Sequence, residues 1–233
     1  PGSAEKARLL LDAMDAHATY VPIDVSPAAL ETIAQELRRS HPDLRVEPVA
    51  ADFTAELALP RDPPRPALFA FLGSTIGNFT PPRAVALLRR VAAAMGPRDR
   101  FLLGADLKKD RARLEAAYND ARGVTAEFNR NMLRVLNREL GADFDPDGFA
   151  HRAVYDDAEG RIEMYLVATR DQTVTIPEIG TYRFHPGDAI RTEVSYKYDR
   201  RTVETLLEEA GYALEEWTTD PEEEFALALA RRR

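Results

Sequence analysis

Residues 67–79 have the sequence ALFAFLGSTIGNF, in which an apolar run leads into a loop with two glycines and an asparagine. The apolar run is typical of a buried strand. Thr80-Pro81 follows the loop and indicates the start of a helix, because the first helical position needs no N–H group. Glycines and an amide side chain at a strand end suit a backbone that approaches a ligand closely. A plain strand-to-helix turn, which is the alternative, would need neither Gly77 nor Asn78.

Strands and helices alternate on both sides of this stretch. The expected helices cover residues 4–16, 28–40 and 82–95, and the expected strands cover residues 18–26, 44–53, 67–72 and 100–107. Strands separated by helices of this length form parallel β-α-β units. We therefore expect an α/β fold with a doubly wound sheet in this part of the chain.

The pattern changes after Asp110. A helical stretch covers residues 112–140 with an interruption at Gly123, and β-rich segments follow at residues 149–156, 161–170, 172–184 and 189–198. A helix over 200–211 and two strands at 213–219 and 224–230 complete the chain. We interpret residues 111–197 as an inserted α+β substrate-binding domain. Residues 1–110 and 198–233 would then form the first domain, which closes with an antiparallel strand pair.

Composition excludes several functions. The net charge of −8 argues against nucleic acid as the main partner, since phosphate binding needs clustered lysine and arginine. The absence of cysteine excludes disulfides, a thiolate nucleophile and cysteine-based metal sites, and it favours a cytoplasmic protein. No apolar run reaches the roughly 20 residues of a membrane span, and we expect a monomer without a membrane partner. We interpret the widely spaced histidines as surface or loop residues rather than metal ligands: His17, His41, His151 and His185.

Glycine and acidic residues at successive strand ends indicate a nucleotide site. The segment Gly2–Lys6 resembles the second half of a glycine-rich cofactor loop at the start of a helix. Asp24 ends the next strand, where such folds hold ribose hydroxyls, and Asp52-Phe53 ends the one after, where it suits adenine. Each feature also has a plainer interpretation: a turn, a carboxylate that caps a helix, and a core phenylalanine. Together they favour one crevice at the carboxyl ends of the strands.

Four longer motifs carry a family resemblance. They are FLGSTIGNFTP at 71–81, GVTAEFNRNMLRVLNREL at 123–140, RIEMYL at 161–166 and TEVSYKY at 192–198. Together they resemble the histidine Nα-methyltransferases of ergothioneine biosynthesis, and the resemblance extends over essentially the whole chain. It implies a Rossmann-like class I methyltransferase sheet, S-adenosylmethionine as the cofactor, and trimethylation of the α-amino group of L-histidine to hercynine.

The resemblance also implies a set of site residues, none of which is a catalytic acid or base. The cofactor would be held by Gly2, Lys6, Asp24, Asp52 and Phe53. The histidine pocket would consist of Gly73, Thr75, Asn78, Tyr118, Phe128, Met164, Glu193 and Ser195. Within this pocket, Asn78 and Tyr118 would bind the substrate carboxylate. Glu193 and Ser195 would bind the imidazole.

These roles suit the chemistry of the side chains. An amide and a phenol donate to a carboxylate, and an acceptor with a hydroxyl can pair with both imidazole nitrogens. Glu193 and Ser195 are two residues apart on an expected strand, so both face the same way. Plainer alternatives stay open, in which Glu193 and Ser195 form a polar stripe that faces solvent. In the same way, Tyr118 and Phe128 would be core aromatics and Met164 would be core filler.

The chain opens inside the expected glycine loop. In the resembling family, a further segment and the first strand of the sheet come before this point and help to close the pocket. We therefore expect a fragment that is poorly stable or inactive by itself. Three other functions stay open: methylation of another amino acid or small amine, a non-catalytic cofactor-binding module, and an NAD-dependent oxidoreductase. Glu193 and Ser195 test the first of these, because an indole or an aliphatic side chain could not use both.

Overall fold

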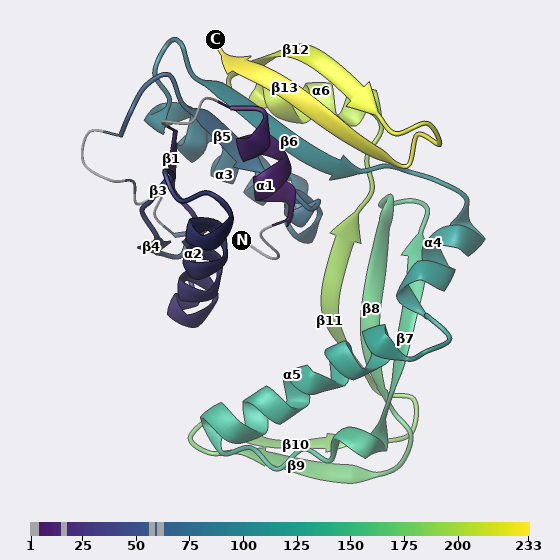
Figure 1. The fold of residues 1–233 in the computed structure, drawn as a ribbon. Helices are drawn as coiled ribbons and strands as arrows, with labels where there is room; N and C mark the ends of the chain where they lie inside the picture. Colours follow the sequence, from purple (N-terminus) through teal and green to yellow (C-terminus); the bar gives the residue numbers. More distant parts are fainter. Residues whose placement is uncertain (1–4, 15–17, 56–58, 60–62) are drawn as a thin grey trace.

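The computed structural model describes residues 5–14, 18–55, 59 and 63–233, which form two lobes (Figure 1). The upper lobe in this view contains the first and the last described residues, and the lower lobe contains residues 111–196. Gly2 lies outside the described residues, so the structure gives no account of its predicted place in the cofactor loop.

A mixed four-stranded sheet forms the centre of the upper lobe, in the order β12-β13-β6-β5. Its strands are β5 (Leu68–Phe71), β6 (Arg100–Asp106), β12 (Tyr212–Thr219) and β13 (Phe225–Arg232). β5 is parallel to β6, whereas β13 runs antiparallel to both β6 and β12. Helices α3 (Pro81–Ala94) and α6 (Arg200–Glu209) contact each other, and their apolar side chains share the main core with those of β6 and β13.

Two pairs of short parallel strands lie beside this sheet, together with helices α1 and α2. Their bounds are α1 (Glu5–Asp12), β1 (Thr19–Tyr20), β2 (Ile23–Asp24), α2 (Pro27–Ser40), β3 (Arg45–Val46) and β4 (Val49–Ala50). β1 pairs with β3, and β2 with β4. The expected strand over residues 18–26 is divided at Pro22 into β1 and β2, and the expected strand over residues 44–53 is divided at Pro48 into β3 and β4. Proline has no N–H group to donate to a neighbouring strand. Leu11 of α1 packs with Ile33 and Leu37 of α2 in a core of its own.

The lower lobe combines a three-stranded antiparallel sheet, in the order β11-β8-β7, with a separate hairpin. Its elements are α4 (Arg111–Tyr118), α5 (Val124–Leu140), the 3-10 turn η2 (Pro146–Gly148), β7 (Phe149–Asp156), β8 (Arg161–Ala168), β9 (Gln172–Ile176), β10 (Gly180–Phe184) and β11 (Ala189–Tyr196). The expected strand over 172–184 is therefore the hairpin of β9 and β10. Both α4 and α5 pack against β7 and β8.

Local sequence explains where several helices begin. Ser26 caps α2, its side chain accepting from the backbone N–H of Ala29, and Pro27 occupies the first helical position. Asp199 begins α6 with a reciprocal pair of hydrogen bonds to Thr202. The helix ends are thus fixed by short polar side chains close in sequence.

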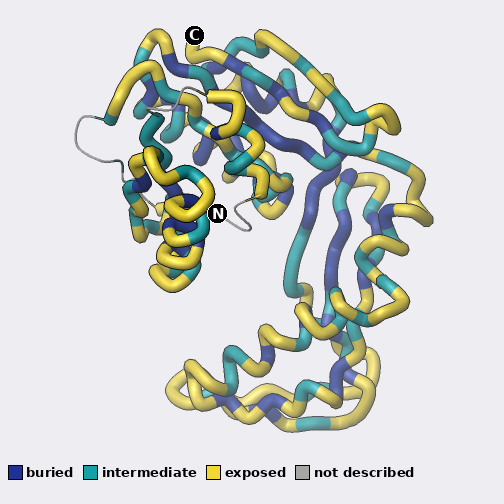
Figure 2. The backbone as a smooth tube through the Cα atoms, in the orientation of Figure 1, coloured by how far each residue is buried: buried dark blue, intermediate teal, exposed yellow. Residues whose placement is uncertain are grey.

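The two lobes meet where two chain segments run side by side. Leu107 and Tyr198 form a parallel bridge, and the backbone N–H of Tyr198 donates to the carbonyl of Asp106 at 2.9 Å. Tyr196 and Tyr198 then bury their rings in the core of the upper lobe. Figure 2 shows the buried parts of β8 and β11 reaching towards this junction. Ligands placed here can contact both lobes.

Two kinds of feature are not found in the part of the chain that the structure describes. No helix there is long and apolar enough to cross a membrane. Among the same residues, no three or more histidine, aspartate and glutamate side chains gather as they would around a metal ion.

Candidate functional site

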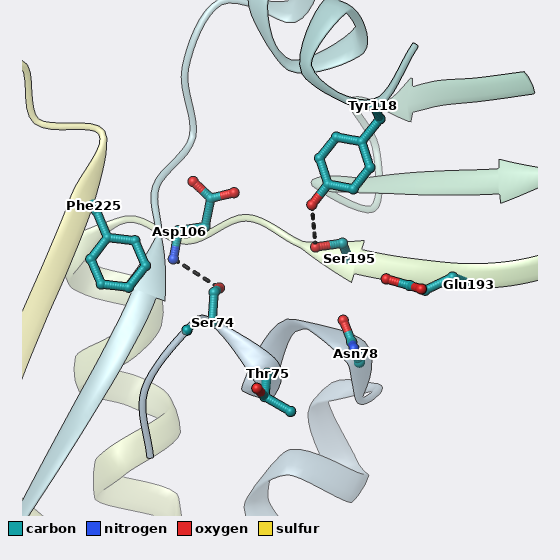
Figure 3. A pocket seen from close by; sticks show the side chains of 9 residues that line it. Ser74, Thr75, Asn78, Asp106, Tyr118, Glu193, Ser195 and Phe225 are labelled. Carbon is teal, nitrogen blue, oxygen red and sulfur yellow. Dashed lines mark hydrogen bonds between the residues drawn. The ribbon is translucent and has the colours of Figure 1, made fainter. Parts of the chain in front are cut away.

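A cavity of about 360 Å³ lies at the junction of the two lobes. It is lined by Gly73, Ser74, Thr75, Asn78, Asp106, Tyr118, Glu193, Ser195 and Phe225. In Figure 3, Glu193 and Ser195 extend from β11 on one side, and Thr75 and Asn78 lie across from them. Six of the eight residues predicted for the histidine pocket line this one cavity, although their roles there stay predictions.

The loop after β5 brings Thr75 and Asn78 to the cavity through an irregular turn. Gly73 and Ser74 both have left-handed backbones, with φ values of 76° and 59°. Ser74 Oγ accepts a hydrogen bond of 2.9 Å from the backbone N–H of Asp106, which ties this turn to the end of β6. The 3-10 helix η1 (Thr75–Asn78) follows and places its last residue at the cavity wall.

Gly77 is required by packing within the protein. A Cβ atom added at Gly77 would lie 2.7 Å from the carbonyl oxygen of Tyr196, closer than real Cβ atoms come to backbone oxygens. The sequence suggested that both glycines of the loop allow close approach to a ligand. For the second glycine, the close neighbour is instead the backbone of β11, which brings Asn78 alongside Ser195.

Strand β11 presents Glu193 and Ser195 on the face that carries Met164 of β8. Glu193 is opposite Met164 in the antiparallel register, and Ser195 is opposite Ile162. Both β8 residues are buried and pack with Leu114 of α4. Glu193 and Ser195 therefore face α4 and the cavity rather than solvent, which removes the plainer interpretation as a solvent-facing stripe.

Tyr118, the last residue of α4, is anchored by a chain of polar contacts. Asn129 Nδ2 lies 2.9 Å from His151 Nδ1, and His151 Nε2 lies 2.8 Å from the carbonyl oxygen of Tyr118. Since Nδ1 accepts from the amide, the Nε2–H donates to the carbonyl. His151 thus stands inside β7 and holds a helix end, so its interpretation as a surface or loop residue is wrong.

A buried lysine, Lys197, lies directly behind the cavity wall. Its Nζ atom is 2.7 Å from Asp106 Oδ2, 2.8 Å from the Tyr118 hydroxyl and 2.8 Å from Ser195 Oγ. The Tyr118 hydroxyl donates to Ser195 Oγ at 3.0 Å, as drawn in Figure 3. Lys109 pairs with the other oxygen of Asp106 at 2.8 Å. We call Asp106, Tyr118, Ser195 and Lys197 the buried network.

Two members of this network, Asp106 and Lys197, are not among the residues predicted from the sequence. Asp106 ends an apolar strand, and the same rule that singled out Asp24 and Asp52 would have found it. Lys197 lies two residues after Ser195, so strand alternation places its side chain on the same face. No sequence signal showed that this lysine would be fully buried.

The carboxyl group of Glu193 has an unusual environment. Partial burial raises the pKa of Glu193 above its ordinary value, and the charge of Lys197 acts in the opposite direction. Among the described residues, none donates a hydrogen bond to the Glu193 carboxyl group, which lines the cavity. Glu193 can therefore accept a hydrogen bond from a ligand that brings an N–H group.

Two predicted pocket residues lie elsewhere. Met164 is 3% exposed and packs in the apolar cluster between β8 and α4, which matches its alternative interpretation as core filler. Phe128 on α5 is 65% exposed and does not line the cavity. The structure brings neither side chain to the cavity surface, and any direct contact with substrate stays a prediction.

Three of the residues predicted to hold a cofactor lie at or just after strand ends in the upper lobe: Asp24, Asp52 and Phe53. Asp24 Oδ1 accepts from the backbone N–H of Ser26 at 2.8 Å, and Asp52 Oδ1 accepts from the backbone N–H of Thr54 at 2.8 Å. Phe53 packs edge-on against Phe71 of β5, with ring centres 5.6 Å apart. We call Asp24 and Asp52 the strand-end carboxylates.

Lys6 of α1, which is also predicted to hold the cofactor, lies close to the cavity. Its Nζ atom lies 3.5 Å from the point that a Cβ atom would occupy on Gly73. Gly73 lines the cavity, so the start of α1 and the loop after β5 stand next to each other. The predicted cofactor side and the predicted substrate side are therefore adjacent.

Comparison with known proteins identifies the family. The model of the family described as histidine-specific methyltransferase, SAM-dependent, matches residues 1–232. The chain belongs to this family. A histidine N-alpha-methyltransferase of Mycobacterium tuberculosis is 44% identical over 236 residues, which cover 99% of this chain and 73% of that protein. Ergothioneine biosynthesis protein 1 of Neurospora crassa is 34% identical over 93% of this chain and 25% of its own length.

Solved structures support the fold of this histidine-specific methyltransferase. The CcbJ methyltransferase of Streptomyces caelestis has a TM-score of 0.53 at 13% identity, over 100% of this chain and 90% of its own. An S-adenosylmethionine-dependent methyltransferase of Clostridium acetobutylicum has a TM-score of 0.52 at 12% identity, over 92% and 75%. The predicted class I methyltransferase fold and the predicted S-adenosylmethionine cofactor are confirmed, and the chain is an enzyme of this type.

The described residues fit this cofactor chemically. Two carboxylates, at the end of β2 and just after its partner β4, suit ribose hydroxyls and an amino group. An aromatic ring stands beside the second carboxylate, and the ammonium group of Lys6 suits a carboxylate. These side chains suit parts of the cofactor chemically, and their assignment to it stays a prediction.

Proposed function

We propose that this histidine-specific methyltransferase transfers methyl groups to the α-amino nitrogen of L-histidine, three in succession, to give hercynine. The observation that carries the proposal is that Glu193 and Ser195 line one cavity together with Asn78 and Tyr118. The names of relatives support it, since the Mycobacterium tuberculosis protein is called a histidine N-alpha-methyltransferase. The same proposal assigns residues 111–197 as the substrate-binding unit.

Two ends of the cavity would recognise the two ends of histidine. Glu193 would accept from one imidazole nitrogen, and Ser195 would pair with the other. Asn78, across the cavity in Figure 3, would donate its amide to the carboxylate. The Tyr118 hydroxyl already donates its hydrogen bond to Ser195 Oγ, so it would donate to the carboxylate only after that bond rearranges. We expect Asn78 to make the main carboxylate contact.

The chemistry needs alignment more than acid or base. Bound S-adenosylmethionine supplies a methyl group on a sulfonium centre. The α-amine must be neutral so that its lone pair is available, and the solvent can remove its proton before binding. Residues that hold both ends of histidine fix the direction of this lone pair towards the side where Gly73 and Lys6 lie.

Each transfer produces an ammonium group that must lose a proton before the next transfer, and the trimethylated product carries a permanent positive charge, which the cavity can accommodate. Its lining includes the carboxyl groups of Asp106 and Glu193 and the rings of Tyr118 and Phe225. Carboxylates and aromatic faces both attract substituted ammonium groups. The same groups that orient histidine would therefore also tolerate later, more cationic intermediates.

A panel of amino acids tests the proposal directly. The protein is incubated with S-adenosylmethionine and each amino acid, and the products are followed by mass spectrometry. We expect histidine to gain up to three methyl groups on its α-nitrogen, and tryptophan to gain few, because indole offers no acceptor to Ser195. If histidine gains none, or if another amino acid reacts better, the proposal is wrong.

Glu193→Ala gives a second test that separates substrate from cofactor. Loss of a charged acceptor should weaken histidine binding roughly 10- to 100-fold and leave cofactor affinity unchanged. Glu216→Ala is the matched control, because Glu216 is an exposed glutamate on β12 that does not line the cavity. Equal loss of both affinities in Glu193→Ala would contradict the assignment of Glu193 to imidazole.

A further inference from the structure

The side chain of Lys197 is completely buried, and its bonds use its whole donor capacity. An ammonium group has three N–H donors and no acceptor. Those of Lys197 point to Asp106 Oδ2 at 2.7 Å, the Tyr118 hydroxyl at 2.8 Å and Ser195 Oγ at 2.8 Å. The side chain has 0% exposure, so water cannot substitute for any of these partners. Lys197 itself therefore has no contact left for a ligand.

The hydroxyl of Ser195 is left with one free function. A serine hydroxyl has two acceptor positions and one proton. Lys197 and Tyr118 both donate to Ser195 Oγ, at 2.8 Å and 3.0 Å, and so occupy both acceptor positions. What remains is the Ser195 proton, and Ser195 lines the cavity. Ser195 can therefore only donate to a bound ligand.

We propose that Lys197 is a positioning residue that makes Ser195 a hydrogen-bond donor and so selects neutral imidazole in one tautomer. This inference rests on the proposed function, in which Glu193 and Ser195 receive the imidazole. A donor at Ser195 requires an unprotonated ring nitrogen, and an acceptor at Glu193 requires an N–H. Neutral imidazole offers one of each, whereas imidazolium has two N–H groups and no acceptor. Histidine would bind with its N–H towards Glu193.

Several charged or titratable groups surround Lys197 and have to be separated from its effect. They come from β6 and the residues after it, from α4, from β7 and from β11, and they are Asp106, Lys109, Tyr118, Tyr155 and Glu193. Glu193 matters most, because protonation of its carboxyl group would also weaken histidine binding at low pH. The test must therefore distinguish titration of the ligand from titration of the protein.

Binding of histidine is measured by calorimetry in the presence of the demethylated cofactor, between about pH 5 and pH 8, where imidazole titrates. For the wild-type protein, we expect the dissociation constant of histidine to rise about tenfold more per pH unit below the imidazole pKa of about 6.5 than that of its 1,2,4-triazole analogue. The analogue has the same α-amine but a ring that stays neutral over this range, so it shares every pH effect of the amine and of the protein. Equal pH profiles for the two ligands would assign the effect to Glu193 or the amine and overturn the inference.

Lys197→Met removes the ammonium group and keeps an unbranched side chain of similar length. We expect roughly tenfold weaker histidine binding at neutral pH, and a much shallower loss of affinity on acidification, since Ser195 regains an acceptor position. Lys197→Arg keeps the charge and should restore the steep loss of histidine affinity at low pH. Lys109→Met is the matched control, because it removes the other lysine on Asp106 and should leave the profile unchanged.

Ser195→Ala tests the same proton with Lys197 in place, in case Lys197→Met does not fold. It should also make the loss of histidine affinity at low pH shallower, without changing cofactor affinity. The inference is overturned if folded Lys197→Met, or Ser195→Ala, keeps the wild-type pH profile while wild type binds histidine. If wild type does not bind histidine, the proposed function fails first and the inference falls with it.

Discussion

The two sides of the candidate site are held in different ways. In the buried network, side chains from β6, α4 and β11 bond to one another, with Lys197 at 0% exposure in the middle. The strand-end carboxylates instead bond to backbone N–H groups two residues further along, as Asp24 does with Ser26. One side depends on elements far apart in sequence, and the other depends on local turns.

This difference predicts different responses to substitution. A network assembled from several elements is rigid and sensitive, because each side chain is held by partners that come from elsewhere in the fold. A carboxylate bonded only within a local turn, as Asp52 is with Thr54, leaves the fold unaffected when it changes. Substitutions on the network side should therefore affect stability and histidine binding, and those at the strand ends should affect cofactor binding alone.

The largest expected effect is in the core that supports the network. Met164→Ala empties a site that is 3% exposed behind Glu193, and it should lower the free energy of unfolding by about 2–5 kcal/mol. Phe128→Ala, at a side chain that is 65% exposed, should change it by less than about 0.5 kcal/mol. Urea denaturation measures both.

Two results with the same variants would contradict the assignment of Met164 to the core and of Phe128 to the surface away from the cavity. If Phe128→Ala weakens histidine binding without any change in stability, then α5 contributes to the substrate side despite lying away from the cavity. If Met164→Ala weakens only histidine binding and keeps full stability, Met164 is a pocket wall rather than core, contrary to its packing with Leu114.

The next effect concerns the contact between η1 and β11. Gly77→Ala places a Cβ atom 2.7 Å from the Tyr196 carbonyl, so either the turn or the strand has to shift. We expect a loss of about 1–3 kcal/mol in unfolding free energy, together with weaker histidine binding. Gly96→Ala is the control, since its Cβ would meet Asp99 at an ordinary 3.5 Å. Equal stability of the two variants would contradict the close contact.

The sequence predicts most elements but misses contacts between elements that are far apart in the chain. Strand ends, helix starts and the Gly73–Asn78 loop follow from local patterns that the structure repeats. The role of Gly77 could not be predicted, because its neighbour Tyr196 is more than a hundred residues away in sequence. The roles of His151 and Lys197 could not be predicted for the same reason, since they have partners on other elements.

A smaller effect is expected at the strand-end carboxylates. Asp52→Asn keeps an acceptor for Thr54 but loses the charge, and we expect roughly tenfold weaker cofactor binding with unchanged stability and histidine binding. Calorimetric titration with S-adenosylmethionine, beside thermal unfolding, measures cofactor binding and stability. A large loss of stability would show that Asp52 supports the fold, as the network does.

The smallest effect concerns Asp120, which lies in the lower lobe but is held by a local turn. Its carboxylate accepts from the backbone N–H groups of Thr125 at 2.8 Å and Val124 at 2.9 Å, and hydrogen bonding to Thr125 and then Val124 lowers the pKa of Asp120 from 3.8 to about 2. A lowered pKa means that this contribution is present above the unfolded value of 3.8 and is lost as pH falls towards about 2.

Amide hydrogen exchange at the start of α5 measures this loss. We expect protection at Val124 and Thr125 to fall between about pH 4 and pH 2 in the wild-type protein, and not in Asp120→Asn, whose side chain cannot titrate. The buried network should keep its protection over most of that range, because its members are held by partners from other elements. If both regions lose protection together, the lower lobe opens as a unit, and the distinction between local turns and long-range contacts does not extend to its dynamics.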